Sequence, residues 1–187
     1  MPDESLKILG PLSILIAVTA GVILVRRWPL GRGKSISAHG GAHRKAYWLY
    51  ACTLTLSGLL FYAFARWWLA PTLGLPNLFN IILLAAVVLQ IMSAWVPDRD
   101  DKSPTTVLHR RAAYGLALCM MALTACIMFT PAVALVVRAM AYITFGLMAI
   151  SWYRFLFDKK AHEKFLIYQS MYIGSFFVLI LLATYVR

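Results

Sequence analysis

Charged residues are scarce in this chain. They make up 13% of its 187 residues, while hydrophobic residues make up 61%. Soluble domains contain roughly 25% charged and about 45–50% apolar residues. This composition excludes an ordinary soluble domain and predicts a protein built for an apolar environment.

Acidic residues are the scarcest charged group, and none of them falls inside a long apolar run. The seven acids are Asp3, Glu4, Asp98, Asp100, Asp101, Asp158 and Glu163. Transporters coupled to protons or sodium normally carry a carboxylate within the membrane, so its absence from these runs disfavours that class. No lysine lies within a run either, which excludes a retinal-type Schiff base.

Cysteine is also rare. Cys52, Cys119 and Cys126 are the only three, and none belongs to a Cys-x-x-Cys pair. All three fall within apolar runs, so we interpret them as small buried hydrophobic residues with no role in binding metal.

What the sequence does contain is six long apolar runs. They cover residues 8–25, 46–65, 78–96, 112–130, 132–153 and 165–186. A membrane-spanning helix needs about 20 such residues, and strict alternation typical of a β-barrel is missing. The predicted fold is an all-α polytopic transmembrane bundle of six spans, forming a single domain over residues 1–187 with no soluble domain. Acids precede the first run and arginines follow it, the reverse of a signal peptide, so it counts as a span.

Basic residues are distributed unevenly between the predicted loops. The loops after the first, third and fifth runs hold 14 of the 18 lysines and arginines. Such loops face the cytoplasm, which predicts a bacterial inner membrane protein with both termini outside. The basic residues are interleaved with apolar runs, so we expect them to contact anionic lipid headgroups rather than nucleic acid.

Small and uncharged polar residues within the runs predict contacts between helices. Three pairs with small-xxx-small spacing favour close helix packing: Ala17 with Gly21, Ala113 with Ala117, and Ser170 with Gly174. Four polar side chains are expected to form hydrogen bonds between helices: Gln90, Ser93, Thr144 and Gln169.

Histidines and acids form a candidate polar cluster on the predicted cytoplasmic side. Its members are His39, His43, Asp98, Asp100 and His109, and His162 precedes a run on the same side. Imidazoles and carboxylates suit zinc, and three ligands with an open water position would form a hydrolytic centre. The alternative is a set of interfacial side chains facing headgroups, and no cofactor is required. The glycines between His39 and His43 predict a flexible loop there.

Arg138 is the one charge well inside a predicted run, seven residues into the fifth. It is a candidate contact for a lipid phosphate, or alternatively a side chain that extends to the outer headgroups.

Two loop motifs carry a family resemblance. Ser35-Ile36-Ser37 precedes the second run, and Val96-Pro97-Asp98 is followed by Leu108-His109-Arg110-Arg111-Ala112-Ala113. In these motifs the chain resembles a bacterial six-helix membrane protein family of unknown function, distantly related to the Frag-one/DRAM/Sfk-like proteins. The resemblance covers about residues 30–115. It implies a small lipid-associated membrane protein, with His109 and Asp98 as a polar pair at the mouth of the bundle.

Three functions remain open from the sequence. The favoured one is a non-enzymatic membrane protein that interacts with lipid, with another membrane protein or with a second copy of itself. The second is a metal-dependent lipid hydrolase that uses His39, His43 and His109 as ligands and Asp98 or Asp100 as the base. The third is a small transporter or channel with a polar cavity that reaches Gln90 and Arg138.

Overall fold

The computed structural model describes residues 3–96, 103–158 and 163–186. Every regular element within these residues is a helix. The elements are η1 (Glu4–Ile8), α1 (Leu9–Arg27), α2 (Ile36–Gly41), α3 (Arg44–Phe64), η2 (Ala65–Leu69), α4 (Ala70–Leu73), α5 (Asn77–Trp95), α6 (Pro104–Phe129), α7 (Leu135–Phe157) and α8 (Phe165–Tyr185). Six helical segments in the described part are long and apolar enough to cross a membrane, which confirms the all-helical prediction and the number of candidate spans.

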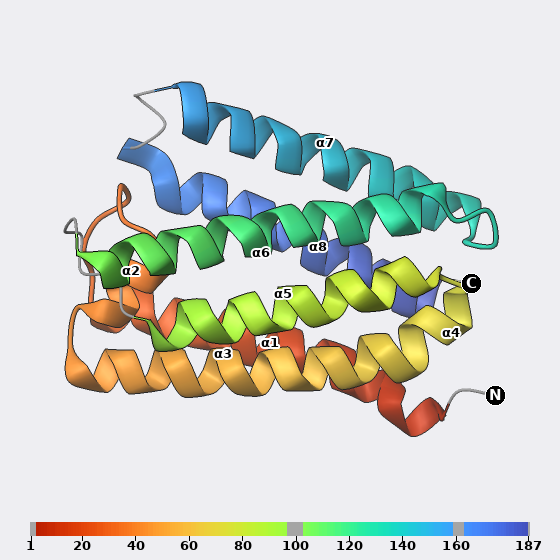
Figure 1. Cartoon of the computed structure of the whole chain (residues 1–187), viewed down its shortest axis with the longest axis horizontal. Coiled ribbons are helices and arrows are strands. Elements are labelled where there is room, and N and C mark those ends of the chain that lie inside the picture. The colour runs from red at the N-terminus through yellow and green to blue at the C-terminus, as the bar shows by residue number, and fades with distance from the viewer. Residues whose placement is uncertain (1–2, 97–102, 159–162, 187) are drawn as a thin grey trace.

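Neighbouring long segments run antiparallel along the bundle (Figure 1), and their contacts form a ring. Around this ring α1 packs on α3, α3 on α5, α5 on α6, α6 on α7 and α7 on α8, and the ring closes where α8 meets α1. The α8–α1 contact is the sparsest of these. We call the end of the bundle that carries α2 the α2 end and the opposite one the far end. Both chain termini lie at the far end, so they share one side, as the even number of spans requires.

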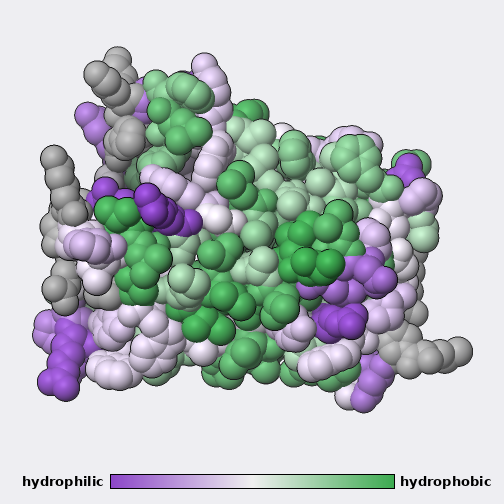
Figure 2. Space-filling view, in the orientation of Figure 1, coloured by the Kyte–Doolittle hydropathy of each residue, from purple (hydrophilic) through white to green (hydrophobic). Residues whose placement is uncertain are grey.

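The outer surface of the bundle is apolar around its middle. Figure 2 shows hydrophobic side chains across the centre of one face and hydrophilic ones gathered toward the two ends. Only 22% to 33% of the residues in the most apolar window of each long segment are buried inside the protein. The apolar residues of these helices therefore point mainly outward, which is the inverse of a soluble helical bundle.

Helix α6 extends well beyond the apolar run that marked it in the sequence. α6 begins at Pro104, eight residues before the predicted span at 112–130, because Ser103 caps it by accepting a hydrogen bond from the Thr106 N–H at 3.3 Å. Pro104 favours the first turn of a helix, where its missing N–H costs nothing. Hydropathy locates the apolar part of such a helix and misses its polar first turns.

The segment after α3 is helical where a loop was expected. A π-helical turn, η2, and the short α4 carry the helix on to Leu73, and Gly74 ends it in the left-handed conformation at φ 63°. Pro71 cannot continue a regular helix because its ring clashes with the carbonyl four residues earlier. The wider turn before it, in which the Ala70 N–H donates to the Ala65 carbonyl, accommodates this break.

The larger cluster of buried residues lies mainly in the far half of the bundle. Phe64, Trp68, Leu69, Phe79 and Leu83 from the α3–η2 and α5 segments are buried against residues of α6, α7 and α8. The rings of Phe64 and Trp68 stack with centroids 5.5 Å apart. A much smaller buried cluster lies toward the α2 end, so the two halves are packed differently.

The cysteine prediction is only partly confirmed. Cys119 and Cys126 are half-buried in α6, but Cys52 is exposed on α3. Membership of an apolar run therefore does not decide whether a cysteine is buried inside the protein. An apolar side chain such as that of cysteine can also lie on a helix face with apolar surroundings.

Candidate functional site

A cavity of about 720 Å³ lies in the α2 half of the bundle. Its walls come from α1, α2, α3, α5, α6, α7 and α8. Small-molecule sites in proteins have volumes of about 300–1,000 Å³ and are mostly apolar with a few polar groups. Because the dense core fills the other half, this cavity is the place where the helices leave room for a ligand.

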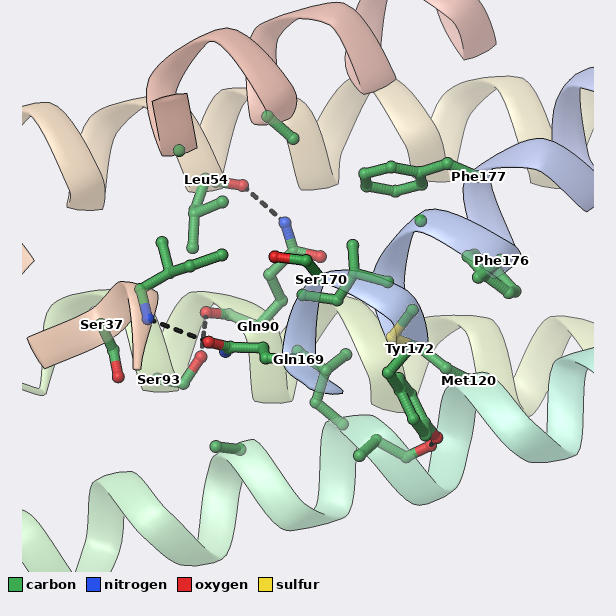
Figure 3. Close-up of a pocket in the computed structure, with 18 of the residues that line it drawn as sticks. Ser37, Leu54, Gln90, Ser93, Met120, Gln169, Ser170, Tyr172, Phe176 and Phe177 are labelled. Atoms are coloured by element: carbon green, nitrogen blue, oxygen red, sulfur yellow. Dashed lines mark hydrogen bonds between the residues drawn. The ribbon is translucent and has the colours of Figure 1, made fainter. Parts of the chain in front are cut away.

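The cavity is apolar at one end and polar at the other. Its deeper wall includes Met120, Leu123, Phe176 and Phe177. Near α2 it is lined instead by Ser37, Ser93, His109 and Gln169. Figure 3 shows Ser37, Ser93 and Gln169 grouped on one side of the space, with Met120, Phe176 and Phe177 on the other. The arrangement suits an amphiphile, whose apolar chain and polar head need different surroundings.

The small-residue pairs predicted for helix packing all lie along the cavity. All six residues of the three pairs line the cavity: Ala17, Gly21, Ala113, Ala117, Ser170 and Gly174. A Cβ atom added at Gly21 or at Gly174 would meet no heavy atom within 4 Å. At these two glycines the prediction of close helix contact is therefore wrong, because the missing side chains leave space between α1 and α8.

This space reaches the outer surface of the bundle beside α1. Val18 and Val22 of α1 line the cavity and are 47% and 46% exposed. The neighbouring contact between α1 and α8 is the sparsest in the ring. The cavity therefore has an opening on the apolar side of the bundle, at the level of Gly21 and Gly174.

A chain of hydrogen bonds joins α2 to α6 at the polar end. The Ser37 Oγ atom lies 2.8 Å from Ser35 Oγ and 3.1 Å from His109 Nε2. On the other side of the imidazole, His109 Nδ1 lies 2.7 Å from the carbonyl oxygen of Val96. Ser37 is 6% exposed and His109 is 3% exposed, and both line the cavity.

The directions of these hydrogen bonds follow from the chemistry of the partners. The Val96 carbonyl can only accept, so the hydrogen of the neutral His109 ring is on Nδ1. The Nε2 lone pair then accepts from the Ser37 hydroxyl. Since the Ser37 hydrogen is used in this bond, Ser35 donates to Ser37, while Ser35 Oγ itself accepts from the Ala38 N–H at 3.0 Å. In this tautomer, Nε2 of His109 is the atom that faces the Ser37 hydroxyl.

Polar side chains of three helices form hydrogen bonds to neighbouring elements, and two of them, Gln90 and Gln169, line the cavity. Gln90 of α5 donates through Nε2 to the Leu54 carbonyl of α3 at 2.9 Å, and Gln169 of α8 accepts from the Ile36 N–H at 2.9 Å. Thr144 of α7 donates to the Ser175 carbonyl of α8 at 3.4 Å. These three confirm the prediction of bonds between elements. Ser93 does not, because it donates to the Gln90 carbonyl within α5.

One buried hydroxyl in the cavity wall has no hydrogen-bond partner among the residues that the structure describes. Ser151 of α7 is 3% exposed and lines the cavity, and no described residue lies within hydrogen-bond distance of its buried Oγ atom. A buried polar group left unpaired costs about 1–3 kcal/mol. A ligand with a polar group in the cavity would satisfy it.

The structure separates His39 from His43. His39 lies within helix α2, 1% exposed, with Nδ1 2.8 Å from the Ser35 carbonyl. His43 is exposed, caps α3 by accepting from the Lys45 N–H at 3.1 Å, and stacks on Trp28. The prediction of a flexible loop between them is wrong, because Gly40 and Gly41 belong to helix α2, which Ser35 caps. Gly40 packs so closely on Tyr50 that an added Cβ atom would lie 2.8 Å from that side chain.

The proposed metal centre has no counterpart in the described part of the chain. Among those residues, no three histidine, cysteine or acidic side chains are grouped so that they could hold a metal ion. Asp98 and Asp100, and also Asp101 and His162, lie outside the described residues. His109 lies at the α2 end of the cavity, and its observed partners are Ser37 and Val96.

Arg138, the candidate arginine, and Arg26, which lines the cavity, lie at opposite ends of the bundle. Arg138 lies in the first turn of α7, at the far end, and is not part of the cavity wall. The distance of Arg138 from the start of its helix was overestimated, because α7 begins at Leu135, three residues later than predicted. Arg26, at the end of α1, is exposed and lines the cavity at the α2 end. From the sequence, Arg26 bore only on the signal-peptide question and on the orientation of the chain.

Several residues of the site were missed from the sequence. Ser37 was noted only as part of a motif, and Ser151 was not noted at all. The signal that could have found Ser37 is that it and His109 belong to two motifs on the same predicted side of the membrane. A scan against protein-family models, a search of curated proteins and a search of solved structures found no match to this chain.

Proposed function

We propose that this chain is an integral membrane protein that binds one lipid in the cavity of its six-helix bundle. The observation that carries the proposal is the cavity itself, apolar toward Phe176 and Phe177 and polar toward Ser37 and His109. An acyl chain that entered between α1 and α8 would lie along the apolar wall. Its headgroup would remain at the α2 end.

The charges at the α2 end support an anionic headgroup. The described basic residues at this end are Arg26, Arg27, Arg32, Lys34, Arg44, Lys45, Arg110, Arg111, Arg154 and Lys164. Each lysine or arginine near an anionic lipid surface contributes about 1 kcal/mol of attraction. By the same rule that relates basic loops to the cytoplasm, we propose that the α2 end faces the cytoplasm of a bacterial cell and that the membrane is its inner membrane.

The channel alternative has less support. A channel through the bundle would require a polar path from Gln90 to Arg138. Gln90 lines the cavity, but Arg138 does not, and the buried residues of the far half lie between the two levels. A cavity that ends against a packed core suits a bound lipid better than a permeating solute.

The test uses a phospholipid with a photoreactive diazirine in one acyl chain. The full-length protein is reconstituted in vesicles of phosphatidylethanolamine and phosphatidylglycerol containing this lipid, irradiated, digested and analysed by mass spectrometry. We expect crosslinks at the cavity residues Met120, which is half-buried, and Phe176, which is buried, in addition to those at outward-facing residues such as Ile81, which is 67% exposed.

Two glycine substitutions provide the matched control. Gly174→Leu adds a side chain inside the cavity, whereas Gly146→Leu adds one at a glycine that also has no atom near its Cβ position but does not line the cavity. We expect Gly174→Leu to abolish crosslinks at Met120 and Phe176 and to leave those at Ile81, and Gly146→Leu to change neither. Native protein without crosslinks at Met120 and Phe176 would contradict the proposal.

A further inference from the structure

We propose that Ser37 and His109 are the nucleophile and the general base of an acyl-transfer reaction on the lipid held in the cavity. This inference rests on the proposed function, because the cavity supplies the substrate. It differs from the metal-dependent hydrolase considered from the sequence, since it needs no metal ion and uses a different set of residues.

The geometry of the pair is that of an activated serine. A serine nucleophile requires a base within hydrogen-bond reach, and a third group that orients the base. The distance from Ser37 Oγ to His109 Nε2 is 3.1 Å. The Val96 carbonyl, 2.7 Å from Nδ1, fixes the tautomer in which Nε2 can accept the serine proton. In hydrolases with a triad this orienting position is held by a carboxylate, and here a backbone carbonyl holds it.

The surrounding hydrogen bonds leave Ser37 able to react. Ser35 donates to Ser37 at 2.8 Å, and Ser37 donates to His109. One lone pair of Ser37 Oγ remains for attack on a carbonyl carbon. Ser35 is itself fixed as the cap of α2, so the nucleophile lies on a short helix that packs tightly through Gly40 on Tyr50 of α3. Such support keeps catalytic groups in register.

The position of the pair along the bundle selects an ester of a membrane lipid. Ser37 and His109 lie at the polar end of the cavity, at the same end as the basic residues that face headgroups. In a phospholipid the ester groups lie just below the headgroup, and the acyl chain continues from the ester toward the membrane centre. An acyl chain along Met120 and Phe176 would therefore place its ester carbonyl near Ser37.

The reaction balances without an external oxidant or metal. Ser37 Oγ attacks the ester carbonyl while His109 Nε2 takes the hydroxyl proton. The bond from the carbonyl carbon to the lipid oxygen breaks, and His109 returns the proton to this leaving oxygen, which gives an acyl-Ser37 and a lysolipid. Water, or the hydroxyl of a second lipid, then attacks the acyl-Ser37 as His109 takes its proton. Ser37 regains the proton, and the product is a fatty acid or a new ester.

The same hydrogen bonds could also serve only to join α2 to α6, so the test must detect nucleophilicity. The reconstituted protein is treated with hexadecyl fluorophosphonate, which phosphonylates activated serines, and the modified residue is identified by mass spectrometry. We expect modification at Ser37 and none in Ser37→Ala. The His109→Asn variant keeps a side-chain N–H for the Val96 carbonyl but lacks the base. We expect Ser37 in this variant to react with the fluorophosphonate at least about 100-fold more slowly. Ser175→Ala is the control, because Ser175 lies on α8 and does not line the cavity.

A second measurement follows the lipid. Vesicles containing phosphatidylglycerol with one labelled acyl chain are analysed for labelled fatty acid, and for labelled diacyl product when a lysophospholipid is added as acceptor. The first product identifies hydrolysis and the second identifies transfer. An unmodified Ser37 in protein that still crosslinks the diazirine lipid at Met120 would overturn the catalytic pair and leave lipid binding in place. Absence of crosslinks at Met120 in the native protein would instead overturn the proposed function.

Discussion

The side-chain oxygen of Gln169 accepts a hydrogen bond from the backbone N–H of Ile36 at a distance of 2.9 Å, although the two residues are 133 positions apart. Ile36 is the first residue of α2, and Gln169 lies on α8. A second bond, from the Leu166 N–H to the Arg32 carbonyl at 3.0 Å, joins the same two regions. Together they hold the helix that carries Ser37 against the helix that forms one edge of the cavity opening.

Replacement of Gln169 tests this connection. Gln169→Leu leaves the Ile36 N–H without its acceptor, and we expect the free energy of unfolding to fall by about 1–3 kcal/mol. Gln169→Glu keeps an acceptor oxygen and should lose less. Unfolding of the detergent-solubilised protein, followed by tryptophan fluorescence, measures both. Equal losses in the two variants would show that the hydrogen bond to Ile36 is not the cause.

A pair of glycine-to-alanine substitutions tests how the two kinds of glycine in this bundle differ. A Cβ atom at Gly10 would lie 2.8 Å from the buried ring of Phe64, whereas one at Gly146 would meet nothing within 4 Å. We expect Gly10→Ala to destabilise the protein by about 1–3 kcal/mol through overpacking. Gly146→Ala should stabilise it by up to about 1 kcal/mol, because alanine favours the helix. The same unfolding measurement compares the stabilities of the two variants. A Gly10→Ala protein more stable than the Gly146→Ala protein would contradict the packing described for Gly10.

The number and approximate positions of the long helices could be predicted from the sequence, because few backbone conformations are possible for a long apolar run in an apolar environment. A backbone that crosses lipid must satisfy its own hydrogen bonds, so each run of about 20 apolar residues predicts one helix. The ends of the helices did not follow, since they depend on local caps. Ser103 starts α6 within a polar stretch, and the π turn before Pro71 continues α3 past its apolar run.

The cavity could not be predicted, because a glycine on a helix can either allow a neighbouring side chain to pack closely or leave an empty space. Gly10 permits close approach of Phe64, while Gly21, eleven residues later on the same helix, faces open space. Spacing alone does not distinguish them, since the distance to the facing helix decides. The same ambiguity affects Gly174, which the small-residue rule assigned to close packing.

The pairing of Ser37 with His109 was within reach of the sequence only in part. Both residues precede apolar runs on the same predicted side, which places them at one end of the bundle. That they meet within hydrogen-bond distance depends on α2, a helix of six residues that was expected to be a loop. Ser35, a residue type that favours the N-cap, was the signal available in the sequence, whereas the packing of Gly40 on Tyr50 is visible only in the structure.

Two adjacent arginines test whether the α2 end of the cavity selects an anionic headgroup. Arg26 lines the cavity, while Arg27 does not and instead lies over the ring of Trp28, with its guanidinium carbon 5.3 Å from the ring centroid. Arg26→Gln and Arg27→Gln remove the same charge from neighbouring positions. A general effect of net charge on the membrane surface would therefore weaken binding equally in the two variants.

We expect only Arg26→Gln to change the headgroup preference of the bound lipid. Loss of one charge close to a headgroup removes about 1 kcal/mol, which corresponds to roughly a fivefold decrease in affinity. The measurement is a competition at Met120 between diazirine-labelled phosphatidylglycerol and unlabelled phosphatidylcholine, in vesicles of fixed total charge. Arg26→Gln should lower the crosslink yield about fivefold at equal lipid ratios, and Arg27→Gln should retain the native yield. Equal decreases in both variants would mean that the headgroup responds to the surface potential and that Arg26 has no specific contact with it.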